Sequence, residues 1–101
     1  MAKTKEAPAR ELGGLDREEL HRLLYLMLLG RRFEDRCAEA YALGKIGGFC
    51  HLYIGQEAVV VGMQAAIGDD DCVVTSYRDH GHMLACGMDP RGVMAELTGR
   101  A

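Results

Sequence analysis

The sequence predicts part of an α/β layered fold that is mostly helical in this segment, with one or two short strands. Three observations predict it. A long amphipathic helix starts after a capping motif at Asp16. The apolar residues 72–76 show no alternation, which is typical of a strand buried on both faces. Helices flank this run on both sides and end at glycines, as in an α/β layered arrangement.

Residues 1–14 are predicted to form a flexible leader, because they are polar and contain proline and glycine. They lack the apolar stretch of a secretion signal, and no later apolar run approaches the ~20 residues that span a bilayer. The net charge of −3, from 12 basic and 15 acidic residues, argues against nucleic acid as a partner. Four cysteines without a Cys-x-x-Cys pair are expected to be reduced thiols. A cytoplasmic location with no membrane contact is therefore expected.

The first helix is expected to run from its N-cap, Asp16, to Gly44. Asp16 and Glu19 have the spacing of a capping box. A helix of about 28 residues is long beside the average of about a dozen, so it should pack across something larger than itself. One apolar stripe at helical spacing follows the cap; it consists of Leu20, Leu23, Leu24, Met27 and Leu28 and is weakly continued by Phe33, Cys37 and Tyr41.

The middle of the chain contains two further elements. Residues 47–55 are bounded by glycines and rich in aromatic and β-branched side chains, which predicts an extended segment. Residues 56–68 contain several alanines, end in glycine and are apolar almost all round, which predicts a buried helix with neighbours on every side. Gly62 inside that helix suggests close packing against another backbone.

Two helices are expected after the predicted strand. The first begins between Ser76 and Asp79 and ends at Gly87. The second has Asp89 as its N-cap and proline at its first position, and it ends at Gly99. Both helices therefore follow the polar cluster at the end of the strand.

Tyr77 and Arg78 are the first candidate site residues. They follow the predicted strand directly, at the edge where open α/β sheets bind ligands. The guanidinium fork of arginine matches phosphate or carboxylate, and tyrosine adds a hydroxyl on a rigid ring. The alternative is an ion pair of Arg78 with Asp79 or with the aspartates at 69–71, and spacing alone slightly favours that alternative.

Histidines and cysteines raise a second possibility. Cys50, His51, His82 and Cys86 have the ligand types of a zinc site, although Cys50 and His51 are adjacent where such sites use ligands two to four residues apart. A lone histidine among apolar residues is more often a core residue than a catalytic one. If His51 faces a cavity, its near-neutral pKa range suits carboxylate binding or proton transfer. For His80, the alternative to binding a ligand is to orient the turn at Gly81.

Three stretches in this order resemble one family: GFCHLYIGQEAVVVG, then CVVTSYRDHGH, then GMDPRGVMAELTGR. The sequence from about residue 15 to residue 100 is similar to the N-terminal part of the alpha subunit of thiamine-diphosphate-dependent 2-oxo acid dehydrogenase components, of the type in pyruvate dehydrogenase complexes. The resemblance implies that residues 15–101 form an incomplete N-terminal portion of a thiamine-diphosphate-binding domain.

The resemblance also implies roles for three residues. Tyr77 and Arg78 match a Tyr-Arg pair that contacts the cofactor diphosphate and lies near the substrate. His51 matches a histidine associated with the 2-oxo acid. The resemblance thus gives Tyr77 and Arg78 as cofactor-binding residues and all three as substrate-binding residues, with no catalytic residue and no metal ligand in this chain.

The implied reaction is oxidative decarboxylation of pyruvate with transfer of the acetyl group to a lipoyl carrier. The implied partners are a beta subunit and the lipoyl acyltransferase of the complex. The family's magnesium-binding motif is absent from these 101 residues, so the isolated chain is expected to be inactive. The alternative hypothesis is a non-catalytic helical interaction module, with or without the Cys/His metal site.

Overall fold

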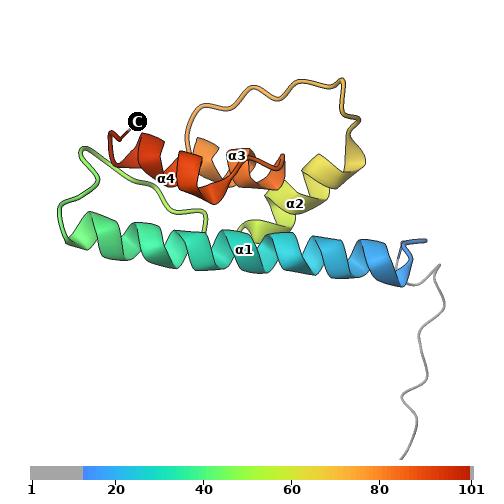
Figure 1. The fold of residues 1–101 in the computed structure, drawn as a ribbon. Coiled ribbons are helices and arrows are strands. Elements are labelled where there is room, and N and C mark those ends of the chain that lie inside the picture. Colours follow the sequence, from blue (N-terminus) through green and yellow to red (C-terminus); the bar gives the residue numbers. More distant parts are fainter. Residues whose placement is uncertain (1–12, 101) are drawn as a thin grey trace, which may run out of the picture.

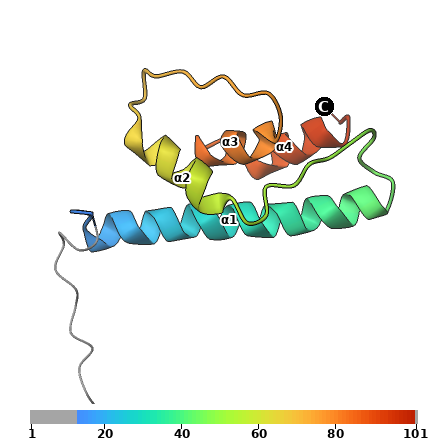
Figure 2. The same cartoon turned by 180° about the vertical axis from the view of Figure 1, so that it is seen from behind.

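The computed structural model describes residues 13–100, which form four helices: α1 (Arg17–Ala42), α2 (Glu57–Ala66), α3 (Asp79–Ala85) and α4 (Pro90–Leu97). The long helix α1 lies along one side, and the three shorter helices lie over it (Figures 1 and 2). Helices α2 and α3 pack on α1 and on each other, and α4 packs on α3. Most of the predicted leader, residues 1–12, lies outside the described residues. None of the described helices is long and apolar enough to cross a membrane.

Helix α1 begins where the capping motif predicts. The Asp16 carboxylate accepts from the Glu19 backbone N–H at 2.8 Å, and the Glu19 carboxylate accepts from the Asp16 N–H at 2.8 Å. The predicted stripe is only partly right, because Leu24 and Leu28 are 54% and 52% exposed. The face that packs is narrower and rotated; it comprises Leu23, Leu26, Met27, Phe33, Glu34 and Cys37.

Two apolar clusters form the core, one toward each end of the layer of short helices. The first contains Phe33, Cys37, Ile46, Leu84 and Val93. The second contains Tyr53, Val60, Val61 and Ala85. Helix α3 supplies a residue to each cluster, so it is the central element through which α1, α2 and α4 are held together.

Helix α2 is confirmed, but its predicted burial on every side is wrong. Val60 and Val61 face the core, whereas Val59 is 65% exposed. A Cβ atom built on Gly62 would meet nothing within 4 Å, so close backbone packing does not explain this glycine. Within residues 13–100, α1 and α3 are the helices that pack on α2, and they leave part of its surface exposed.

The predicted strand at residues 72–76 is not formed, and residues 13–100 contain no strand at all. This segment instead makes the long connection between α2 and α3 (Figure 1). Val74 is 96% exposed there. A strand needs a neighbouring strand to satisfy its backbone N–H and C=O groups, and the described residues provide none. The segment at 47–55 also stays irregular.

The last two helices follow the sequence-based expectations. Helix α3 starts at Asp79, and the residue after its C-cap, Gly87, has a φ of +99°. Helix α4 starts at Pro90, and the Asp89 carboxylate caps it by accepting from the Arg91 N–H at 2.9 Å. Local signals therefore mark the end of α3 and the start of α4, as predicted, whereas the N-cap of α3 makes no side-chain capping hydrogen bond.

Candidate functional site

Arg78 connects two segments that are remote in sequence. It is the N-cap of α3, and within residues 13–100 it is the only non-glycine residue with a positive φ, at 59°. Its Nε donates to the Leu52 carbonyl oxygen at 2.9 Å. A left-handed arginine is uncommon and persists where its surroundings impose it. The hydrogen bond to Leu52 joins this turn to the segment at 47–55.

The structure brings the three predicted site residues together. The Arg78 guanidinium carbon lies 4.9 Å from the centre of the Tyr77 ring, and Nη1 donates to the Tyr77 hydroxyl at 3.4 Å. The His51 ring meets the Tyr77 ring edge-on, with 5.5 Å between centroids. All three line one open hollow on the surface; its remaining walls are Phe49, Cys50, Asp79, His80, Met83, Glu96 and Leu97.

The ion-pair alternative for Arg78 is wrong for the residues that the structure describes. Asp79 accepts from the Thr75 hydroxyl, and Asp71 accepts from the Gly68 N–H at 2.7 Å. No ion pair joins Arg78 to an acidic side chain within residues 13–100. The Arg78 guanidinium group is held by a neutral carbonyl and an aromatic ring, so its positive charge is available to an anionic ligand.

The four possible zinc ligands do not converge. Within the described part of the chain, no group of three or more histidine, cysteine or acidic side chains is placed to hold a metal ion. His51 lies against Tyr77, whereas the His82 ring meets Tyr53 edge-on at 5.7 Å. The Cys86 thiol donates to the Met83 carbonyl at 3.2 Å. The geometry gives the Cys/His metal alternative no support.

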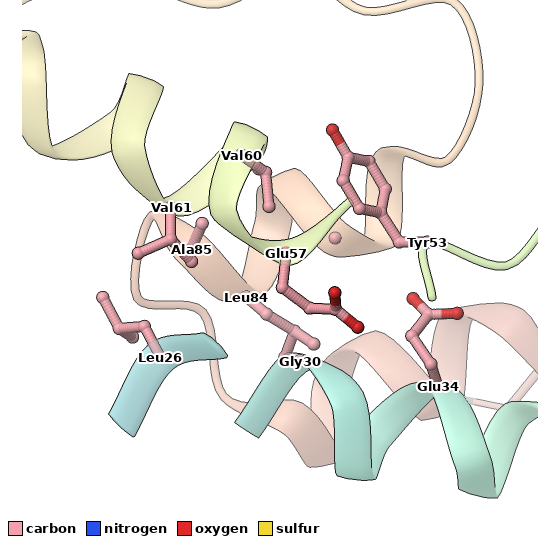
Figure 3. Close-up of a pocket in the computed structure, with 10 residues that line it drawn as sticks. Leu26, Gly30, Glu34, Tyr53, Glu57, Val60, Val61, Leu84 and Ala85 are labelled. Carbon is pink, nitrogen blue, oxygen red and sulfur yellow. The ribbon is translucent and has the colours of Figure 1, made fainter. Parts of the chain in front are cut away.

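A small cavity lies between α1, α2 and α3, and it is lined by none of the residues that line the hollow. Figure 3 shows the carboxylates of Glu34 and Glu57 beside it, one from α1 and one from α2, and Tyr53 also lines it. Its free volume of about 10 Å³ corresponds to about one water molecule. Both acids are buried, and they differ in how their charges are compensated.

Glu57 is fully compensated. Arg31 donates from Nε at 2.5 Å, and the Gly55 N–H donates to both carboxylate oxygens at 3.2 and 3.1 Å. The Arg31 hydrogen bond, against an opposing effect of burial, lowers the pKa of Glu57 to about 2. This ion pair joins α1 to α2.

We expect Glu57→Gln to destabilise the chain by roughly 1–2 kcal/mol near neutral pH, because Arg31 is half exposed and water screens the pair. The folded-state pKa of Glu57 is below its unfolded value of 4.5, so this stabilisation is complete above 4.5 and falls as the pH drops toward about 2. The difference in unfolding free energy between wild type and variant should thus shrink as the pH falls from about 4.5 to about 2 in urea titrations. A pH-independent difference would contradict the prediction.

Glu34 has a different environment. Its side chain is 1% exposed, and its Oε1 lies 2.6 Å from Nε2 of His80, which is also buried. The contact lacks hydrogen-bond geometry, and neither carboxylate oxygen has a hydrogen-bond partner among the described residues. Sequence reasoning missed Glu34. The available signal was an acid four residues after Gly30 and between Phe33 and Cys37, on the face that turns inward.

Comparisons with known proteins identify one family for this chain. A family model described as dehydrogenase E1 component matches residues 25–101. The chain is 73% identical over 74 residues to a pyruvate dehydrogenase E1 component subunit alpha of Rhizobium meliloti (strain 1021), covering 73% of this chain and 21% of that protein. The corresponding protein of Zymomonas mobilis is 66% identical over 87 residues, covering 85% of this chain and 25% of the relative.

A chloroplastic pyruvate dehydrogenase E1 component subunit alpha-3 of Oryza sativa is 51% identical over 98 residues, covering 96% of this chain and 23% of the relative. The chain thus spans between a fifth and a quarter of the length of these relatives. The family match includes α2, α3 and α4, most of α1 and the whole hollow with Tyr77 and Arg78. The chain belongs to the dehydrogenase E1 component family.

Proposed function

We propose that the chain is the N-terminal segment of a pyruvate dehydrogenase E1 alpha subunit, and that Tyr77 and Arg78 bind the diphosphate of thiamine diphosphate. One observation carries the proposal. Arg78 is held in a left-handed conformation by the Leu52 carbonyl, beside Tyr77 and without an acidic partner in the described residues. A buttressed arginine without a carboxylate suits a doubly charged ligand better than a structural ion pair.

The donors fit a diphosphate. The Nε contact to Leu52 directs one edge of the Arg78 guanidinium into the protein, and the Tyr77 hydroxyl adds a neutral hydrogen-bonding group beside Nη1. His51 is exposed at the same hollow, where its ring can bind the carboxylate of a 2-oxo acid. Thiamine diphosphate supplies the electron sink that decarboxylation of a 2-oxo acid requires. In this proposal magnesium is bound by residues outside this chain.

The proposal extends to the whole enzyme. It oxidatively decarboxylates pyruvate and passes the acetyl group to a lipoyl carrier on the acyltransferase of the complex, and a beta subunit completes the cofactor site. The complete thiamine-diphosphate-binding layered fold is part of this proposal, and Phe49 and Val74, exposed at 91% and 96%, are apolar side chains that it would cover. The cytoplasmic location stays a prediction.

The test is Arg78→Ala in the assembled alpha–beta enzyme that contains this segment. We expect the Kd for thiamine diphosphate with magnesium to rise about 10- to 100-fold, the cost of losing charge-assisted hydrogen bonds. Isothermal titration calorimetry measures it. Arg91→Ala on α4 is the matched control, because Arg91 is exposed and lies outside the hollow. An unchanged Kd in Arg78→Ala would refute the diphosphate role.

A further inference from the structure

We infer that Glu34 is a positioning residue for this site: acting through His80, it holds the start of α3 and thereby the Arg78 side chain. The inference rests on the proposed function of Arg78 and adds a residue from a different helix. Glu34 lies on α1, far from the hollow in sequence and outside its lining. Its effect on the ligand is therefore indirect.

The first step is the contact between helices. Glu34 Oε1 and His80 Nε2 are 2.6 Å apart, with side chains only 1% and 7% exposed. The Phe33 ring, from the same turn of α1, lies 6.3 Å from the His80 ring, centroid to centroid. One turn of α1 thus holds the imidazole by a polar contact and an aromatic one. If His80 moved away, the buried Glu34 carboxylate would lose its close polar neighbour, which costs free energy.

The second step leads from His80 to Arg78. His80 is the second residue of α3, and Arg78 is its N-cap. The Gly81 N–H, on the other side of His80, donates to the Arg78 carbonyl at 3.2 Å. This hydrogen bond spans His80, so the backbone of Arg78 is part of the first turn of α3 that His80 fixes against α1. Because its φ of 59° is costly for a non-glycine residue, this turn relaxes unless its neighbours hold it.

The third step is the contrast between the two buried acids. Glu57 receives hydrogen bonds from Arg31 and from the Gly55 N–H, so stability alone explains it. Glu34 has His80 as a close contact and no hydrogen bond to either oxygen within residues 13–100. A buried polar contact without hydrogen-bond geometry contributes little to stability, and an apolar pair of similar volume would often serve the fold better. We therefore assign the Glu34–His80 contact a different effect: it fixes the position of the start of α3 relative to α1.

The experiment is a double-mutant cycle in the assembled alpha–beta enzyme, with Glu34→Gln, His80→Asn and both together. The readouts are the Kd for thiamine diphosphate with magnesium, by calorimetry, and Tm measured separately. Each single variant is expected to weaken binding about tenfold, and the double variant also by about tenfold rather than a hundredfold, because both changes break one contact. A product of the two single effects would overturn the route through His80.

Val93→Ala is the control for a merely structural role. Val93 is fully buried on α4 in the first apolar cluster, away from Arg78. It should lower Tm while Kd stays within about twofold of wild type. If the rise in Kd for a given fall in Tm is the same in Val93→Ala and Glu34→Gln, then Glu34 acts only on stability and the inference is wrong. Should Glu34→Gln not assemble, His80→Asn alone is compared with Val93→Ala by the same criterion.

Failure of this inference is distinguishable from failure of the proposed function. Normal binding in Glu34→Gln together with weakened binding in Arg78→Ala overturns the positioning role and leaves the diphosphate site intact. Normal binding in both variants overturns both. Weakened binding in both, with coupling between Glu34 and His80, supports both.

Discussion

Gly81→Ala is expected to destabilise the chain by about 2 kcal/mol or more, although alanine is the better helix former by about 1 kcal/mol. A Cβ atom on Gly81 would lie 2.7 and 2.9 Å from two carbons of the Tyr53 ring. Tyr53 is buried in the second apolar cluster, so its ring cannot move aside without opening that cluster. Urea-induced unfolding followed by circular dichroism measures the loss.

The matched control is Gly92→Ala on α4. A Cβ atom there would meet nothing within 4 Å, and Gly92 is also inside a helix. The control should be neutral or stabilising by up to about 1 kcal/mol. In the assembled enzyme, Gly81→Ala should also weaken cofactor binding, because the displaced first turn of α3 carries Arg78. Equal stabilities of the two alanine variants would show that α3 does not need its close approach to Tyr53.

Phe33→Ala is expected to cost about 3–5 kcal/mol, the range for removing a buried aromatic side chain. The Phe33 side chain is 7% exposed and lies in the first apolar cluster with Leu84 and Val93. Its removal leaves a cavity where α1, α3 and α4 meet, and none of these helices can close it without losing contacts elsewhere. The measurement is the free energy of unfolding in urea.

Leu28→Ala is the comparison on the same helix. Leu28 belongs to the apolar stripe that the sequence predicts, yet it is 52% exposed. Its replacement should change stability by no more than about 0.5 kcal/mol. A loss from Leu28→Ala as large as that from Phe33→Ala would mean that the predicted stripe, and not the rotated face, carries the packing of α1.

Local rules predicted the helices well. The capping box of Asp16 and Glu19 and the cap-proline pair at Asp89 and Pro90 depend on atoms within a few residues, so the sequence contains all the information they need. Tyr77, Arg78 and His51 were proposed as site residues from the family motifs they occupy, and their role stays a prediction. The sequence could not show that all three line one hollow, because this depends on the hydrogen bond from Arg78 to Leu52, which is 26 residues away in the chain.

What the sequence by itself determined is therefore the position of each helix, the leading candidates for the site and the family. The tertiary structure alone decided which face of α1 is buried, that residues 72–76 remain a loop, and that Arg78 has no acidic partner in the described chain. It also revealed the Glu34–His80 contact. The physical reason is that helix caps close over a few residues, whereas burial, strand pairing and ion pairing depend on which remote segments come together in space.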